Sequence, residues 1–172
     1  MDVGEEIYDV VDLNDCVLGQ ATRREIHARS LYHRSVHVLV FNPAGDLFLQ
    51  KRSHEKDENP GLWDTSSAGH VDAGETYEDS AVRELFEELG IHEELKPFLS
   101  LNAGPETFWE HVRVFTCTTR KTIRVNPREI SEGRYWTLPE IREILTADPA
   151  QITSTFKIIF NIYLTRLEDK YS

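Results

Sequence analysis

The sequence has few cysteines, few positive charges and no long hydrophobic run. Its 172 residues include 2 cysteines, too few for a disulfide framework. The 30 Asp and Glu outnumber the 19 Lys and Arg, and a net charge of −11 argues against a broad surface for nucleic acid or an anionic membrane. No stretch approaches the ~20 apolar residues of a membrane span, and no signal-peptide pattern is present. We therefore expect a soluble, cytoplasmic protein without nucleic-acid or membrane partners.

The composition and the turn signals predict one α+β domain. Hydrophobic residues make up 40% of the chain, and no linker or repeat interrupts it, so we expect a single domain over residues 1–172 with an N-terminal strand extension over 1–32. The pattern predicts a polar, helical segment after the second strand and a hairpin turn at 42–45. Strands are expected at 6–12, 16–23, 35–41, 46–52, 98–104 and 107–120, and later helices at 138–145 and 152–167. Such an order favours helix–sheet–helix layers.

A strongly acidic segment between Gly69 and Ile91 predicts a helix with two distinct faces. Thr76 is a suitable N-cap, and Gly90 suits the left-handed position after the helix. An apolar stripe recurs every four residues, and we expect it to be buried together with its apolar neighbours. The stripe is Ala81, Leu85 and Leu89, and its neighbours are Val82 and Phe86.

Glu84, Glu87 and Glu88 share another face of this helix. One interpretation is a solvated acidic face, which is the common case for scattered glutamates. However, carboxylates ~5 Å apart repel one another by roughly 3 kcal/mol per pair at an effective dielectric of 20. A partly shielded cluster therefore favours a hard divalent cation, Mg²⁺ or Mn²⁺ as a substitute.

The same segment resembles the signature of the Nudix hydrolase superfamily. The signature is Gly, five residues, Glu, seven residues, then Arg-Glu-apolar-x-Glu-Glu-x-Gly-apolar. It is met at every position by Gly69, Glu75, Arg83, Glu84, Leu85, Glu87, Glu88, Gly90 and Ile91. The resemblance implies a mixed sheet between helices, an α/β/α sandwich in which residues 69–91 form a loop, a helix and a loop beside the active site.

The resemblance also implies an activity and roles for these residues. The activity is Mg²⁺-dependent hydrolysis of a diphosphate joined to another group, X. Glu84, Glu87 and Glu88 would bind the metal. Gly69 would shape the loop, and Arg83 would pair with Glu75 to hold the helix.

Parts of the sequence between His33 and Trp136 resemble the branch that contains the type I isopentenyl diphosphate isomerases. The similar segments are HRSVHVLVFNPAGDLFLQKR, NPGLWDTSSAGHVDAGE and EHVRVF. The isomerases carry an essential cysteine immediately before a Gly-His pair, where this chain has Ala68. They also usually depart from the hydrolase signature, which this chain satisfies. Both differences favour phosphate hydrolysis over isomerisation.

Further residues match metal-binding positions of the isomerases. His33, His70 and Glu110 match such positions and His27 lies near another, while Phe108 replaces a second glutamate. For the histidines, an ordinary polar role is the alternative to metal binding. A glutamate is disfavoured in an aromatic and β-branched strand unless it is solvated or functional, so Glu110 is a candidate catalytic or metal-binding residue.

Basic and aromatic residues outside the signature are weaker candidates. Lys51 and Arg52 should point to opposite faces at a strand end, where one of them could hold substrate phosphate or both could be solvated. The aromatic residues could stack on a substrate or belong to the core, and they are Trp63, Phe108, Trp109 and Trp136. We expect Cys117 to be a buried hydrophobe and Cys16 an ordinary thiol.

These observations predict a Mg²⁺-dependent pyrophosphohydrolase that acts on a small-molecule diphosphate. Metal-activated water would attack phosphorus, with Glu87, Glu88 or Glu110 as general base. Two alternatives stay open, an isopentenyl diphosphate isomerase and a Nudix module that binds without turnover. The N-terminal strands could also pair two subunits into a homodimer.

Overall fold

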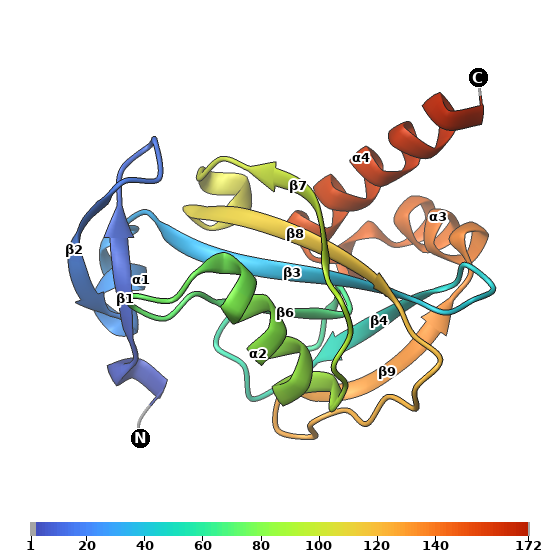
Figure 1. Cartoon of the computed structure of the whole chain (residues 1–172), viewed down its shortest axis with the longest axis horizontal. Helices are drawn as coiled ribbons and strands as arrows, with labels where there is room; N and C mark the ends of the chain where they lie inside the picture. The colour runs from blue at the N-terminus through green and yellow to red at the C-terminus, as the bar shows by residue number, and fades with distance from the viewer. Residues whose placement is uncertain (1–2, 172) are drawn as a thin grey trace.

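A seven-stranded mixed sheet runs through the computed structural model, which describes residues 3–171 (Figure 1). The strand order is β5-β4-β3-β8-β7, with β6 paired to β3 and β9 paired to β4. Strands β3 and β8 are parallel, and all other paired strands in this sheet are antiparallel. The strands are β3 (His33–Phe41), β4 (Leu47–Arg52), β5 (Trp63–Asp64), β6 (Ser67–His70), β7 (Lys96–Leu101), β8 (Glu110–Thr118) and β9 (Ile130–Trp136).

The helices cover both faces of this sheet, as expected from the sequence. Helix α2 (Tyr77–Leu89) packs on one face through Ala81, Leu85 and Leu89, which are all fully buried. Helices α3 (Leu138–Ala147) and α4 (Ser154–Tyr171) cover the other face, where Phe156 and Phe160 fill the core. Alternation along β3 explains the two layers, because Val36 and Val38 face α2 while Leu39 faces α4.

The N-terminal segment forms its own hairpin beside the main sheet (Figure 1). Strand β1 (Ile7–Val11) pairs with β2 (Val17–Thr22), and helix α1 (Arg23–Arg29) follows, which confirms the predicted strands and helix. Thr22 caps α1 in a capping box with Glu25. A bridge between Tyr8 and Asp72 joins β1 to the loop before α2, so the hairpin lies beside the Nudix-like segment.

The β3–β4 hairpin opens soon after its turn. Gly45 has a positive φ of 88°, as the predicted turn requires, but only Phe41 and Leu47 pair across the two strands. Beyond that point β6 pairs with β3 at Ser35–Val38. The hydroxyl of Ser66 accepts a hydrogen bond from Val40 N–H and donates one to Phe48 C=O, so it bridges the opening between the strands.

Two expectations about burial and strand limits are wrong. Val82 and Phe86 are 43% and 50% exposed, because each lies one residue beyond the buried stripe and is rotated about 100° away from the sheet. The strand expected to start at Thr107 starts at Glu110, since Phe108 and Trp109 adopt left-handed backbone conformations with φ of 54° and 65°. Strand β9 has no counterpart among the elements expected from the sequence.

Within residues 3–171 no helix combines the length and apolarity that crossing a membrane requires.

Candidate active site

Gly69 of β6 lies against the side chain of Glu84 on α2. A Cβ on Gly69 would lie 2.1 Å from Glu84 Cδ, well inside van der Waals contact. A side chain at this position would thus clash with Glu84. Backbone conformation does not require glycine here, because the φ of Gly69 is not positive. Burial and the nearby charge of Glu88 raise the pKa of Glu84, although Arg83 acts in the opposite direction.

Glu88 lies one helical turn further on and is 2% exposed. Its Oε2 accepts hydrogen bonds of 3.0 Å from both Ala68 N–H and Gln50 Nε2. Burial raises the pKa of Glu88, while the charge of Lys56 and the bond from Ala68 oppose the shift. The site thus contains two shielded carboxyl groups that repel each other, which is the arrangement that favours a bound cation.

Arg83 joins the loop before α2 to its acidic face. It donates to Glu75 at 2.9–3.3 Å, so the ion pair expected from the resemblance is present. It also contacts Glu84 at 2.7 Å and Glu87 at 3.4 Å, and donates to the carbonyl of His70. Glu87, whose side chain is 54% exposed, lies on the outer side of this network. The guanidinium thus supplies part of the positive charge that the carboxylates need.

An open cleft contains this acidic face together with several basic residues. It has an empty volume of about 2240 Å³, including its mouth, and extends from α2 to the N-terminal hairpin. Its lining includes the acidic residues Glu84, Glu87 and Glu88 and the basic residues Arg23, Lys56 and Arg128. Acidic residues for a cation and basic residues for an anion therefore share one cleft.

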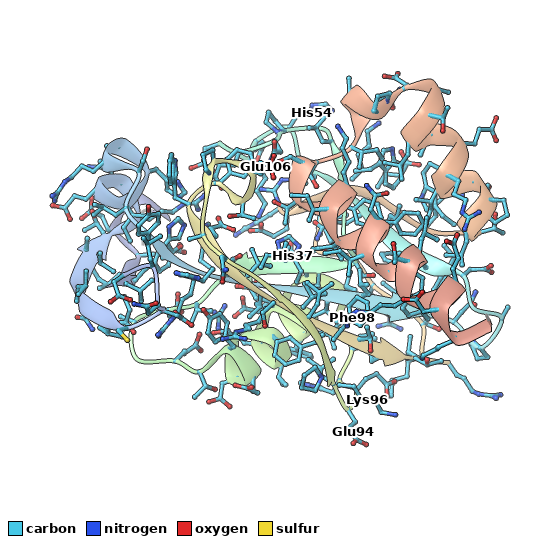
Figure 2. The ribbon with its side chains drawn as sticks, turned by 90° about the horizontal axis from the view of Figure 1, so that it is seen from above. His37, His54, Glu94, Lys96, Phe98 and Glu106 are labelled. Atoms are coloured by element: carbon cyan, nitrogen blue, oxygen red, sulfur yellow. The ribbon has the colours of Figure 1, made fainter. Side chains whose placement is uncertain are left out.

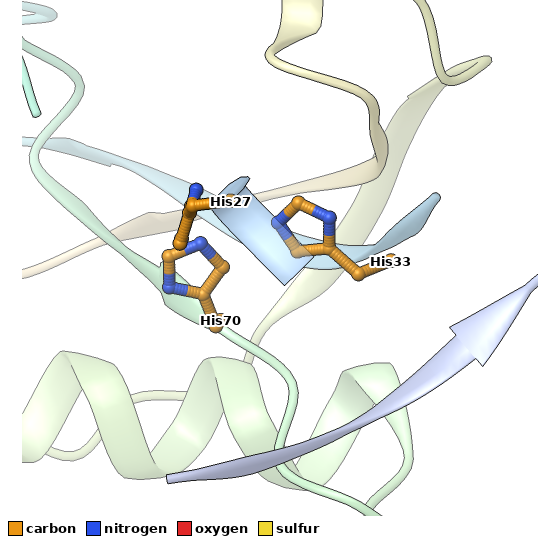
Figure 3. A group of neighbouring side chains, drawn as sticks. All are labelled: His27, His33 and His70. Atoms are coloured by element: carbon orange, nitrogen blue, oxygen red, sulfur yellow. The ribbon is translucent and has the colours of Figure 1, made fainter. Parts of the chain in front are cut away.

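A second group of possible ligands lies near the carboxyl end of β6. His27, His33 and His70 offer nitrogen atoms within 4.8 Å of one another, although they come from α1, β3 and β6 (Figure 3). Glu58, His70 and Glu110 form an overlapping group. His70 Nε2 lies 3.1 Å from Glu110 Oε1, and His33 Nε2 lies 3.5 Å from the same oxygen.

Hydrogen bonds set the charge of this group. Burial acts to raise the pKa of Glu110, but bonds with His33 and His70 outweigh it and hold that pKa well below its usual value. The same partnership raises the pKa of His33 against the effect of burial. Burial prevails at His70 and lowers its pKa. Glu110 is therefore an anion stabilised by neighbouring imidazoles.

The structure tests whether each set of donors fits a metal ion. Among residues 3–171, only the two groups around His70 bring three donor atoms within 4.8 Å. The α2 glutamates do not form such a group, and Arg83 contacts two of them. Nevertheless, the shielded carboxyl pair Glu84 and Glu88 suits a hard cation such as Mg²⁺, and the imidazole–carboxylate group suits a transition metal such as Mn²⁺.

The remaining basic and aromatic candidates from the sequence do not line the acidic cleft. Trp63 is 5% exposed and packs edge-to-face on Trp136 at 5.0 Å, so both belong to the core. Lys51 lies over the Trp63 ring at 5.8 Å, whereas Arg52 is buried beside Asp64. Trp109 contacts Tyr32 instead of the acidic cleft, and Phe108 is 36% exposed. Cys117 is buried and Cys16 exposed, as predicted.

Sequence reasoning missed Glu58 and Gln50. Glu58 contacts His27 at 2.9 Å from a loop that the sequence marks only as polar. Gln50 is fully buried in β4, and its bond to Glu88 spans 38 residues. A glutamine that directly follows three apolar residues of this strand is the one local signal for the second contact, because a buried amide needs a partner.

Comparisons with known proteins identify the family of this chain. The family model of the NUDIX domain matches residues 31–156. An uncharacterized Nudix hydrolase of Pseudomonas aeruginosa is 40% identical over 134 residues, covering 76% of this chain and 78% of that protein. Isopentenyl-diphosphate Delta-isomerase 2 of Photorhabdus laumondii is 33% identical and covers 91% of this chain and 92% of its own.

A solved structure extends the likeness to the fold. The crystal structure of DR0079 from Deinococcus radiodurans superposes with a TM-score of 0.74 at 30% identity, covering 83% of this chain and 90% of that one. Its fold agrees with the mixed sheet and flanking helices described above. This chain therefore belongs to the Nudix hydrolase family, and that membership supports the expected enzyme class, a pyrophosphohydrolase.

Proposed function

We propose that this protein is a Mg²⁺-dependent hydrolase of a diphosphate joined to a group X. The observation that carries the proposal is the pair of shielded carboxyl groups, Glu84 and Glu88, whose pKa values are both raised by burial. Placing two such groups side by side is unfavourable without a cation, and a diphosphate can approach an acidic cleft when a cation neutralises both sides.

Glu84, Glu87 and Glu88 would hold Mg²⁺, with Mn²⁺ as a substitute. When bound, the ion neutralises charge on the diphosphate and lowers the pKa of a water molecule. Gly69 leaves room for the Glu84 carboxylate, and Arg83 holds Glu84 against Glu75. These contacts fix the ligand geometry before substrate arrives, which favours catalysis.

The basic side of the cleft would receive the phosphate oxygens. Arg23 and Lys56 line both the acidic cleft and the neighbouring cavity around His70, so they lie where the two halves of a substrate would meet. Arg and Lys donate several hydrogen bonds to anionic oxygens. We propose that they orient the diphosphate above α2.

Glu87, Glu88 and Glu110 are the candidates for the general base. A base accepts a proton best when its pKa lies near the working pH. The pKa of Glu110 is held well below its usual value by His33 and His70, which makes Glu110 a weak proton acceptor. We therefore favour a base on α2.

Variants of α2 test this function. The phosphate-containing products should be measured by chromatography, with Mg²⁺ and with EDTA, over nucleoside diphosphates and triphosphates, nucleotide sugars, cofactor diphosphates and prenyl diphosphates. Glu88→Gln should lower kcat about 100-fold or more, whereas Glu78→Gln, at an exposed position on the same helix, should leave it unchanged. Equal activity of both variants would contradict the proposal.

The second candidate function is isomerisation of isopentenyl diphosphate. Two observations favour it, namely the two overlapping groups of possible metal ligands around His70 and the sequence similarity to isomerases. Ala68 opposes it, because a methyl group cannot exchange a proton with the substrate. Incubation with isopentenyl diphosphate separates the two functions, since an isomerase would yield dimethylallyl diphosphate without phosphate release.

Three further expectations belong to the same proposal. We propose a single catalytic domain over residues 1–172, a cytoplasmic location and a homodimer that pairs the N-terminal hairpins. Leu13, Val17 and Leu18 are exposed apolar residues on that hairpin, which supports a partner there. Light scattering of the wild type and of Leu18→Ser tests the dimer.

A further inference from the structure

A polar cavity opens on the α4 side of β6, adjacent to the acidic cleft. It has an empty volume of about 560 Å³, including its mouth, and shares Ala68, Gly69 and His70 with the cleft. Its inner wall comes from β3, from the residues around β5 and from the start of α4. The residues of that wall are Ser35, His37, Arg52, Asp64, Thr153 and Thr155.

Strand β3 explains why a cavity exists at this place. Its residues on one face are His33, Ser35, His37 and Leu39, in that order from the histidine group to the apolar core. Each of the first three is at most 5% exposed, although this face is otherwise apolar at Leu39. Figure 2 shows His37 deep within the molecule, close to the start of α4. The polar stretch is therefore interior, and buried polar groups require partners.

Several groups in this wall have hydrogen-bonding capacity that residues 3–171 do not use. The hydroxyl oxygen of Ser35 is buried and has no hydrogen-bond partner among residues 3–171. His37 Nδ1 contacts Thr65 Oγ1 at 2.8 Å, and no hydrogen bond to Nε2 occurs within the described chain. Burial lowers the pKa of His37, so the neutral ring has one donor and one acceptor nitrogen.

Asp64 anchors the base of the cavity. Its Oδ1 accepts hydrogen bonds from Thr65 N–H at 2.8 Å and from Thr153 Oγ1 at 3.0 Å. Arg52 lies 3.6 Å from Oδ2 and donates to the carbonyl of Glu58 at 2.9 Å, so both charged side chains are paired. The anchored charges hold this wall in place, so the wall offers a ligand neutral hydroxyl and imidazole groups, while charged residues line other parts of the cavity, namely Arg23, Lys56, Glu58 and Glu110.

We propose that this cavity binds the group X of the substrate and that X is a sugar. The inference rests on the proposed diphosphate hydrolysis, since the diphosphate would lie on α2 and X would extend past Ala68 into the cavity. Sugar hydroxyls donate and accept hydrogen bonds, as do Ser35, His37 and Thr155. Phe108, exposed at the rim, offers an aromatic face to the C–H side of a sugar ring.

The same wall disfavours a prenyl group. An apolar chain in this cavity would leave Ser35 Oγ and His37 Nε2 without hydrogen-bond partners. Sites built to bind hydroxyl groups reject analogues that lack them much more strongly than apolar pockets reject an extra methylene. The cavity therefore distinguishes a sugar diphosphate from isopentenyl diphosphate independently of Ala68.

Ser35→Ala is the decisive variant. Because the Ser35 hydroxyl has no hydrogen-bond partner among the described residues, its removal costs the fold no hydrogen bond that the structure shows and should leave the Tm unchanged or raised. It should lower kcat/KM for ADP-ribose about tenfold, the effect of losing one hydrogen bond, and leave kcat/KM for inorganic pyrophosphate unchanged. Thr155→Val should act in the same direction. Ser100→Ala, at an exposed position on β7, is the matched control and should change neither value.

The outcomes separate this inference from the proposed function. A selective loss with ADP-ribose supports the sugar site, whereas an equal loss with both substrates, or no loss with ADP-ribose, overturns it. Absence of hydrolysis with every substrate would refute the proposed function instead. In that event calorimetry with ADP-ribose and Mg²⁺ decides, because binding about tenfold weaker to Ser35→Ala supports the cavity assignment. Equal binding to both proteins, or no binding to the wild type, overturns it.

Discussion

Replacement of Gly69 by alanine is the perturbation whose effect follows most directly from the geometry. A Cβ at this position would lie 2.1 Å from Glu84 Cδ, and ordinary contacts begin near 3.4 Å. The carboxyl group of Glu84 must therefore move by about 1.3 Å, the difference between these distances. The backbone itself accepts alanine, because Gly69 does not have a positive φ.

Two magnitudes follow from this displacement. Overpacking of a filled site costs typically about 1–3 kcal/mol of unfolding free energy. Misplacement of a catalytic group by about 1 Å lowers the rate about 100-fold. Gly69→Ala should thus lose about 100-fold in kcat and bind Mg²⁺ more weakly, with a Tm several degrees lower.

The assay compares Mg²⁺ titrations of the diphosphate hydrolase activity for three variants. Gly19→Ala is the control, since no atom lies within 4 Å of its Cβ and its φ is not positive. The double variant Gly69→Ala/Glu84→Asp shortens the side chain that clashes and should recover part of the Mg²⁺ affinity. Wild-type kcat and Mg²⁺ affinity in Gly69→Ala would refute the account of Glu84 as a ligand held against Gly69.

Other predictions concern charge. Without metal, the unfolding free energy of the wild type should fall as the pH rises above about 4.5, because the raised pKa of Glu88 makes the folded protein retain a proton that the unfolded chain releases. In Glu88→Gln this fall should be smaller, and urea titrations at pH 5 and pH 8 measure the difference. Arg83→Met removes hydrogen bonds to Glu75 and Glu84 and should lower the unfolding free energy by about 1–2 kcal/mol. Thermal scans measure this loss, and Mg²⁺ should restore part of it. Glu110→Gln should lower the pKa of His33 in an NMR titration, and its stability deficit should be largest below pH 6.5 and shrink as the pH rises through the folded-state pKa of His33.

Local sequence signals were sufficient for most of the fold around α2. The N-cap Thr76, the left-handed Gly90 and the buried stripe Ala81, Leu85 and Leu89 all occur as predicted. These features depend on neighbours within one or two helical turns, so a single segment contains the information. The family signature added the Arg83–Glu75 pair, which the structure contains.

Features that depend on distant segments could not be predicted in the same way. Glu58 meets His27, and Gln50 meets Glu88, through the packing of segments that lie far apart in the sequence. Propensity also failed at Phe108, where a β-forming residue adopts a left-handed conformation in the turn before β8. Tertiary contacts and turn geometry outweighed local preference at these positions.

The central claim is that a divalent cation stabilises the shielded carboxyl groups of α2 and holds a diphosphate against them. The most direct measurement is anomalous diffraction from crystals soaked in Mn²⁺ with a non-hydrolysable diphosphate analogue. The account predicts an anomalous peak within about 2.0–2.3 Å of oxygens from Glu84 and Glu88 and from the analogue. A peak confined to the His27–His33–His70 group, with none on α2, would contradict it.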